Sequence, residues 1–304
     1  MAAPTSLMKS ADATVTAREI DFITRFQQTW EALREIMGIT RMVKKQPGTS
    51  LTYKYGEVTL ASSVPTEGDA VTFSQAKVKT KTYGTLTIER YAKAVSGEAI
   101  LDHGYDVAVA LTDQQFLNEL QGKVLDKFYT FLGTGTLTST ETAFQMAVAM
   151  AIGKVRDKFK TMRRDVTAIN VFVNTIDAYK YLGAANLTVQ NVFGMQYVEN
   201  FMGADRLILT SEIDSGKVIA TPSDNMVLYY IDPNESDLSR AGIAFRTLGE
   251  TPLIGFHVEG NYTNWISETY ALMGMGLFAE YLDGIAVITV QEPEEADAGG
   301  GLGG

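Results

Sequence analysis

The chain has 304 residues, of which 45% are hydrophobic and 20% are charged, a balance typical of a globular protein. It contains no cysteine, which excludes disulfide bonds, thiolate metal sites and thiol catalysis. The formal net charge of −10 argues against a dedicated reader of nucleic acid, which is expected to be basic. An acidic container for nucleic acid stays compatible with this charge, because weak or repulsive contact lets an enclosed polymer move.

The sequence predicts neither a secretory signal nor a membrane-spanning helix. The N-terminus lacks a basic region followed by an apolar segment. The longest apolar stretches, at 143–153 and 271–279, are well short of the roughly 20 residues that cross a bilayer. We therefore expect a soluble chain.

The N-terminal region predicts a flexible polar arm, residues 1–14, followed by an amphipathic helix. Thr16 and Glu19 have the spacing of a capping box at the start of this helix. Its apolar residues recur at steps of three and four and stop near Gly38: Ile23, Phe26, Trp30, Leu33 and Met37. This stripe packs either on the core of its own chain or on a neighbouring subunit, and both interpretations stay open.

Residues 51–96 predict a β-ribbon, and they are the most informative part of the chain. The outgoing run covers 51–60, a turn follows at 62–69, and the return run starts at 71–73 and passes through 86–88. Both runs are rich in Thr, Val, Lys and Tyr and have too few apolar residues to bury one face. A two-stranded ribbon by itself is marginal in water, so we expect a partner surface, which another copy of the chain could supply.

Two more helices are predicted after the ribbon. The first starts at a capping box, 112–115, and ends at Gly133; its stripe is Phe116, Leu120, Val124, Phe128 and Phe131. The second is predicted to start at 138–141 and to run to Phe159, with a basic end made of Arg156, Lys158, Lys160, Arg163 and Arg164. Cations suit the negative end of a helix dipole, so we interpret this cluster as capping rather than as a binding patch.

From residue 167 onwards, short predicted strands and helices are mixed. The sequence predicts a buried strand at 168–173, a short helix ending at Gly183, and strands at 195–198, 206–209, 217–220, 226–231, 255–259 and 265–272. A small helix near 278–282, a strand at 284–290 and a disordered acidic tail complete the prediction. Strands and helices intermix without strict βαβ alternation, which favours an α+β fold.

No catalytic, cofactor or metal site is predicted, and we do not expect an enzyme. His257 lies in an alternating run typical of a strand, and Asp102 with His103 is only a weak candidate for a catalytic pair. The chain has no nucleophile elbow and no phosphate-binding Gly-x-x-x-x-Gly-Lys loop. Residues 232–243 begin like a calcium loop but lack its glycine and its final glutamate.

The order of these elements resembles the Hong Kong 97-type fold of tailed-bacteriophage major capsid proteins. The local likeness is closest in the ribbon, at Glu67-Gly68, 71–73, Lys77-Val78-Lys79 and Tyr83-Gly84. Residues 172–183 and 191–208 resemble the axial domain of that family, and 278–288 resembles the end of its peripheral domain.

The resemblance implies a domain plan and a function. The implied parts are an N-terminal arm and helix (1–50), an extended loop (51–96), a peripheral domain (97–165 and 250–292) whose spine is the 112–133 helix, an axial domain (166–249) and a disordered tail (293–304). The implied protein builds an icosahedral phage head from hexamers and pentamers around double-stranded DNA and belongs to the virion. An encapsulin-type shell, which encloses cargo enzymes, is the alternative.

The resemblance also implies partners and contact residues. Partners would be many copies of the chain, a separate scaffolding protein, a portal and decoration proteins, with no cofactor, metal or membrane. The expected inter-subunit contacts lie on the ribbon and the first helix: Glu67, Gly68, Phe73, Lys77, Tyr83, Phe26 and Trp30. Some relatives crosslink a ribbon lysine to a neighbour, but we do not extend crosslinking to Lys77, Lys79 or Lys81.

Overall fold

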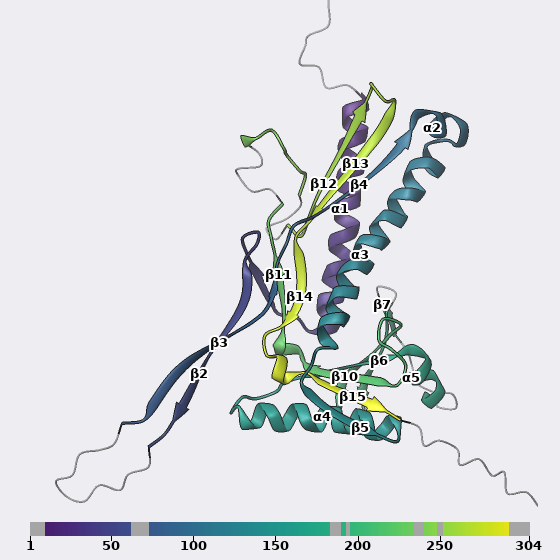
Figure 1. The fold of residues 1–304 in the computed structure, drawn as a ribbon. Helices are drawn as coiled ribbons and strands as arrows, with labels where there is room; N and C mark the ends of the chain where they lie inside the picture. The colour runs from purple at the N-terminus through teal and green to yellow at the C-terminus, as the bar shows by residue number, and fades with distance from the viewer. Residues whose placement is uncertain are drawn as a thin grey trace, which may run out of the picture.

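The computed structural model describes residues 10–61, 73–182, 190–192, 195–233, 240–247 and 252–291 (Figure 1). The helices are α1 (Ser10–Met37), α2 (Gly97–His103), α3 (Leu111–Leu132), α4 (Phe144–Thr161) and α5 (Thr175–Leu182), and a π-helical turn, η1 (Asp106–Ala110), joins α2 to α3. Short 3-10 turns lie at η2 (Ser223–Asn225) and η3 (Leu282–Gly284). Within the described residues, no helix is long and apolar enough to cross a membrane.

The described strands form four sheets. The largest has the order β5 (Leu137–Glu141), β15 (Ala286–Val290), β10 (Lys217–Pro222), β6 (Ile169–Asn174), β9 (Ala204–Thr210), β8 (Met195–Phe201) and β7 (Gln190–Val192). A second sheet has the order β12 (Ile254–Asn261), β13 (Ile266–Met273) and β4 (Glu89–Ser96), and a third has β1 (Arg41–Lys44), β11 (Met226–Tyr230) and β14 (Met275–Ala279). The fourth is the ribbon, β2 (Ser50–Thr59) and β3 (Gln75–Thr85).

The seven-stranded sheet is covered on both faces. All six residues of β6 are buried, as the continuous apolar run in the sequence predicted. Val171 and Val173 face a core that α4 completes with Val148 and Val155, while Phe172 points to the opposite side. Phe172 therefore packs with the end of α3 instead.

The second layer is built by α1 and α3 beside the β12-β13-β4 sheet (Figure 1). The predicted α1 stripe is confirmed as apolar and buried, and the ring of Phe22 stacks on Phe256 of β12 at a centroid distance of 3.9 Å. On α3, Leu120, Val124 and Phe128 belong to the same core. The apolar residues of each stripe are buried together because helical periodicity places them on one side of the helix.

The ribbon leaves the body of the molecule, as the sequence predicted. Figure 1 shows β2 and β3 extending away from the other sheets, and in the described residues they pair only with each other. At the base of the ribbon, Leu51 is buried in a small cluster with Leu86 and Val227. This cluster anchors the ribbon, while its outer part projects into solvent.

Several predicted boundaries are wrong. Helix α1 already includes Ser10, six residues before the expected cap, and α3 continues from η1 instead of starting at residue 112. The Thr112 hydroxyl donates to the Ala108 carbonyl rather than capping a helix. Residues 138–141, which were predicted to start a helix, form β5, and α4 starts at Phe144, because 137–141 pairs in parallel with β15.

The C-terminal part holds two further corrections. Residues 275–279 form β14 paired with β11 where a small helix was expected, and only the turn η3 follows it. The return run of the ribbon ends with β3, because β4 pairs with β13 and belongs to the second sheet.

The sheets divide the chain differently from the predicted domain plan. Elements β5, α4 and β15, which were assigned to the peripheral domain, lie with the seven-stranded sheet. Chain order does not reveal this, since β15 reaches that sheet from the far end of the sequence. The predicted disordered tail lies outside the described residues.

Candidate inter-subunit surfaces

The ribbon presents one apolar face. Directly opposite residues of an antiparallel pair share a face, and Val58 stands opposite Ala76 while Gly56 stands opposite Val78. Val58 is 59% exposed and Val78 is 75% exposed. Leu60, just after β2, is exposed as well. We call Val58, Leu60, Ala76 and Val78 the ribbon patch.

The opposite face of the ribbon is charged. Glu57 stands opposite Lys77 and forms an ion pair with Lys79, whose Nζ lies 2.5 Å from Glu57 Oε2. The hydrogen bond and the charge of Lys79 lower the pKa of Glu57. Lys54, opposite Thr80, is exposed on the face of the ribbon patch, so the described ribbon combines solvent-facing valines with excess positive charge.

The ribbon residues expected to contact a neighbour fall into two groups. Phe73, 95% exposed, and Lys77 are open to solvent, as a contact residue must be in the free subunit. Glu67, Gly68 and the side chain of Tyr83 lie outside the described part of the structure. They remain predictions.

The expectation that Phe26 and Trp30 contact a neighbouring subunit is wrong. Their side chains are 0% and 3% exposed and belong to the core that α1 forms with α3 and the β12 strand. For these residues, the α1 stripe therefore packs on the core of its own chain. A stripe of this kind has the same sequence pattern whether its partner is in the same chain or another.

Sequence reasoning missed a second exposed surface, at the end of the molecule formed by α2, η1 and the β12–β13 turn. Its large exposed side chains are Leu101, Tyr105, Val107, Leu111, Tyr262 and Trp265. We call these six residues the distal surface. The backbone joins its two parts, because the Gly97 N–H donates to the Trp265 carbonyl at 2.8 Å. The available signal was a set of apolar residues at 101–111 that belongs to none of the predicted stripes.

The distal surface lies among acidic residues. Glu98 and Asp102 are on α2, and Asp106 opens η1. Large exposed apolar side chains that gather at one end of a soluble protein are a mark of interaction sites. Its charge is opposite to that of the described part of the ribbon, and Figure 1 shows the two regions at opposite ends of the molecule.

The residues considered for catalysis are not assembled into a site. Asp102 and His103 are exposed at the end of α2, and His257 lies on β12 as predicted. The Nδ1 atom of His257 is 3.6 Å from Oε1 of buried Glu19, which accepts the Val258 N–H at 2.8 Å. Within the described residues, no group of three or more His, Asp or Glu side chains could hold a metal ion.

Comparison with known proteins places the fold. No protein-family model and no curated protein matches the chain. Solved structures do match it, at about 10% identity. A virus-like particle protein from Pyrococcus furiosus has a TM-score of 0.50 and 10% identity, covering 89% of this chain and 99% of that one. The capsid of cyanophage P-SCSP1u has a TM-score of 0.53 and 10% identity, covering 85% of this chain and 88% of that one.

An encapsulin is equally similar. The holo-SrpI encapsulin complex from Synechococcus elongatus PCC 7942 gives a TM-score of 0.52 and 11% identity, covering 86% of this chain and 89% of that one. At such identities, the likeness establishes the fold. It confirms the predicted α+β class and the fold expected from the order of elements.

Proposed function

We propose that this chain, which has the Hong Kong 97-type capsid fold, is a structural protein that assembles into a closed shell, and that the shell is the head of a tailed phage around double-stranded DNA. The observation that carries the proposal is the ribbon. Its strands pair only with each other in the described residues, and Val58 and Val78 are exposed. Contact with a neighbour would cover that apolar area and stabilise an otherwise marginal element.

The distal surface suits such a contact. It offers apolar side chains with acidic neighbours, while Lys54 lies on the same face of the ribbon as the ribbon patch, so both hydrophobic area and charge are complementary. The two regions lie far apart on one subunit (Figure 1). A ribbon that binds the distal surface of the next copy makes a heterologous contact, which can repeat around a ring.

The remaining roles follow from this proposal. Phe73 and Lys77 would contact the neighbouring subunit, and Glu67, Gly68 and Tyr83 would do so from the rest of the ribbon. The shell would need no cofactor and catalyse no reaction. Scaffolding, portal and decoration proteins would be further partners, and the finished location would be the virion.

Electron microscopy of the purified chain tests the proposal directly. We expect closed particles of uniform size, either from the chain alone or after addition of a scaffolding protein. Particles rich in double-stranded DNA after expression with the phage packaging components would support the phage head. Monodisperse monomers under every assembly condition would contradict shell formation.

The alternative is an encapsulin-type compartment around cargo enzymes. The encapsulin likeness, with a TM-score close to that of the cyanophage capsid, keeps this function as the second candidate. The contents of purified particles separate the two. A co-purifying folded enzyme on the inner wall would favour the compartment, and packaged genomic DNA would exclude it.

A further inference from the structure

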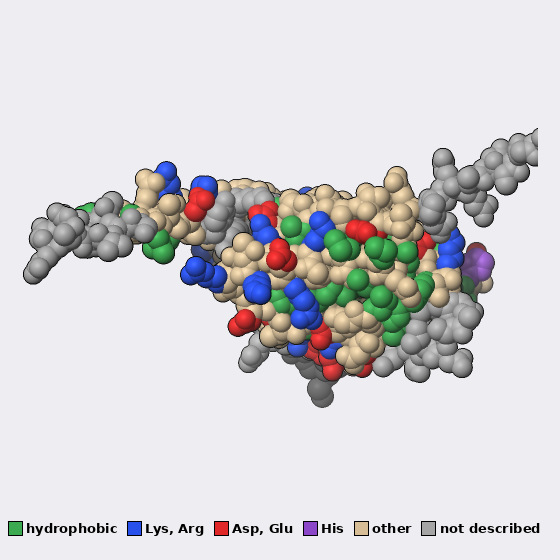
Figure 2. Space-filling view, turned by 90° about the horizontal axis from the view of Figure 1, so that it is seen from below, with side chains coloured by type: hydrophobic (Ala, Val, Ile, Leu, Met, Phe, Trp, Pro, Cys, Tyr) green, Lys and Arg blue, Asp and Glu red, His purple; other side chains and the backbone are tan. Residues whose placement is uncertain are grey.

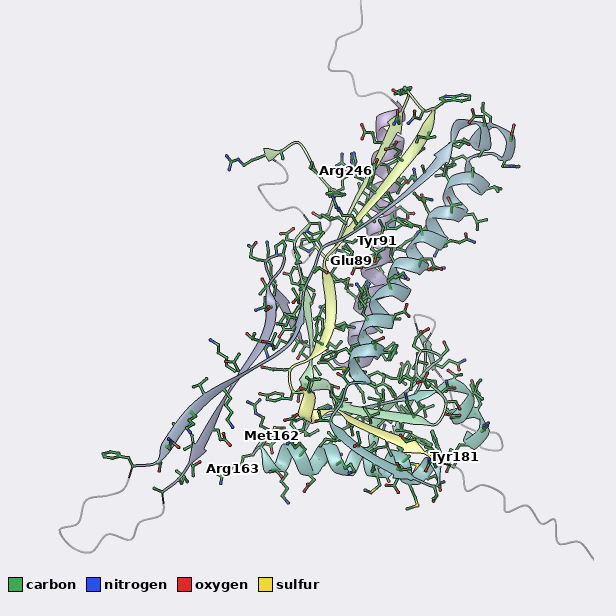
Figure 3. All side chains as sticks on the ribbon, in the orientation of Figure 1. Glu89, Tyr91, Met162, Arg163, Tyr181 and Arg246 are labelled. Carbon is green, nitrogen blue, oxygen red and sulfur yellow. The ribbon has the colours of Figure 1, made fainter. Side chains whose placement is uncertain are left out.

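A cationic hollow lies at the C-terminal end of α4. Its lining is Arg156, Lys160, Arg163, Arg164, Asp165 and Val166, and it is an open surface depression with a volume of about 340 Å³. We call it the α4 hollow. Figure 3 labels Met162 and Arg163 at this end of the helix. Figure 2 views this face, and on the body of the molecule it shows Lys and Arg side chains gathered towards the ribbon and hydrophobic ones farther from it.

Two of the cations lie in line on the helix, and the others follow its end. Arg156 and Lys160 are spaced by four residues and lie on one side of α4 in successive turns, and Arg163 comes two residues after the last residue of the helix, Thr161. Arg156, Lys160 and Arg163 are all exposed. Such a series of cations matches a ligand that carries several negative charges along its length.

The end of α4 has an arginine where glycine is preferred. The Arg163 N–H donates to the Lys160 carbonyl and the Arg164 N–H to the Phe159 carbonyl, both at 2.9 Å, which is the Schellman arrangement. Arg163 has a φ of 54°, in the left-handed region that glycine adopts most easily. Glycine would adopt this conformation with less strain, so the fold by itself does not favour arginine at this position.

Arg164 is held by packing. Its guanidinium carbon lies 4.5 Å from the ring centroid of Tyr281, and this ring packs edge-on against Phe159 at 6.1 Å. The aromatic face fixes the position of the cation without neutralising it. Arg164 therefore adds a positioned charge to the series.

The charge of the α4 hollow is not balanced from within the described part of the chain. There, neither Arg156 nor Lys160 nor Arg163 takes part in an ion pair, and Asp165 is the one carboxylate in the lining. Interaction with the helix dipole accounts for a cation in the last turn. It does not require four cations to converge on one hollow in a chain whose net charge is −10.

We propose that the α4 hollow binds backbone phosphates of nucleic acid and is the place where the shell wall holds the enclosed polymer. Arg is suited to this role because its planar guanidinium can bind two phosphate oxygens at once. An acidic peptide fits less well, since docked peptides use apolar anchors and Val166 is the one apolar residue of the lining. The assignment of the polymer as enclosed cargo rests on the proposed function, whereas phosphate binding does not.

Binding of a fluorescent 20-base-pair DNA duplex to the purified chain, over a series of salt concentrations, tests the proposal. The test variant carries Arg156→Gln, Lys160→Gln and Arg163→Gln. The control removes equal charge with Arg90→Gln, Lys123→Gln and Lys180→Gln, which are exposed and lie on three other elements. The slope of log affinity against log salt is negative, and we expect its magnitude to decrease by about 2.7 in the test variant. This corresponds to roughly 0.9 for each phosphate that the protein no longer neutralises.

The corresponding decrease in affinity at 0.1 M salt is on the order of 10²–10³-fold if binding converges at 1 M salt. Equal decreases in the test and control variants, or none in either, would overturn the proposal. So would tighter binding of poly-glutamate than of DNA at the same salt, which would assign the hollow to an acidic peptide. Displacement of DNA by millimolar inorganic phosphate would also count against it, as it would indicate a site for a single small anion.

Electron microscopy of the same preparations separates this proposal from the proposed function. If the test variant forms particles that contain less nucleic acid than the control, both proposals stand. If no variant forms particles while the difference in DNA affinity persists, shell formation fails and phosphate binding survives. If particles of both variants contain equal nucleic acid, the α4 hollow does not hold the polymer.

Discussion

The ring of Phe172 on β6 lies edge-on to the ring of Phe128 on α3, with a centroid distance of 5.9 Å and an interplanar angle of 80°. Both side chains are fully buried. This contact joins the seven-stranded sheet to the long helix, so the two layers share one core at this point. Phe172 is also edge-on to Tyr129, at 5.8 Å.

Substitution Phe128→Ala tests how much this contact stabilises the chain. We expect the free energy of unfolding to fall by about 3–5 kcal/mol, because a large aromatic ring is removed from a site that cannot collapse around the cavity. Urea unfolding followed by fluorescence measures the change. Phe73→Ala is the control: its ring is 95% exposed, and a change within about 0.5 kcal/mol is expected. Similar decreases in the two variants would show that burial does not explain the effect.

A second prediction concerns Asp113, which joins α3 to α1 and β4. Arg18 Nε and Nη2 donate to the two carboxylate oxygens at 2.5 and 2.8 Å, and Lys93 Nζ lies 2.6 Å from Oδ1. Burial by itself would raise the pKa of Asp113, but the hydrogen bonds from Arg18 and Lys93 outweigh it, and the pKa is lowered. Asp113→Asn leaves two largely buried cations unpaired and should cost about 2–4 kcal/mol at pH 7.

The pH dependence of this cost has a definite sign. Because the folded pKa lies below the ordinary value of about 4, ionised Asp113 stabilises the chain above that pH, and the contribution is lost as pH falls through the lowered folded pKa. The difference between wild type and Asp113→Asn should therefore be largest at about pH 5–7 and shrink towards about pH 2. A difference that stays constant over this range in urea unfolding would show that the charge is not its origin.

The ribbon patch gives a third prediction. Val78→Glu places a charge on the exposed apolar face, so assembly should fail while the monomer keeps its free energy of unfolding within about 0.5 kcal/mol. Removal of residues 64–70 should act in the same way. Size-exclusion chromatography and electron microscopy measure assembly, and Thr59→Glu, an exposed position on the opposite face of the ribbon, is the matched control. If these variants lost monomer stability together with assembly, the ribbon would be part of the core of the monomer.

Charge exchange tests whether the ribbon binds the distal surface. Lys54→Glu, on the same face as the ribbon patch, should impair assembly because it repels the acidic residues near α2, and Asp102→Lys should impair it because it repels Lys54. The double variant restores opposite charges and should recover assembly in part. Strictly additive effects of the two substitutions would indicate that Lys54 and Asp102 act at separate interfaces.

Arg163 provides a prediction in which stability and binding change in opposite directions. Arg163→Gly relieves the left-handed conformation and should stabilise the fold by about 0.5–1 kcal/mol. The same variant should bind DNA more weakly, with a salt slope lower by about 0.9. Arg156→Gly, in the interior of α4, should instead destabilise the fold by about 1 kcal/mol. A destabilised Arg163→Gly would show that the arginine itself supports the helix end.

Several elements were predictable because their cause is local. The stripes of α1 and α3 follow from helical periodicity, and the largely apolar run of β6 follows from burial on both faces. The capping-box pattern was less reliable. Residues 138–141 fit that pattern and also fit a strand, and their pairing with β15, which lies at the far end of the chain, decides between the two.

The candidate surfaces show the same division. The exposed ribbon was foreseen from its shortage of apolar residues, whereas the distal surface combines α2, η1 and the β12–β13 turn, which are distant in the chain. Trp30 and Leu101 are both apolar residues on helices, yet one is 3% exposed and the other is 73% exposed. No local pattern separates them, because only the packing of other elements determines which is covered.

The sequence by itself thus determined that the chain is α+β, that it lacks thiol chemistry, and that its ribbon has too few apolar residues to be stable alone. These properties depend on composition and on neighbouring residues. The tertiary structure decided that Phe26 and Trp30 belong to the subunit's own core, and that β15 joins the sheet that α4 covers. It also decided that four cations meet around one hollow. Each of these depends on contacts between distant segments, whose free energy exists only once the whole chain has packed.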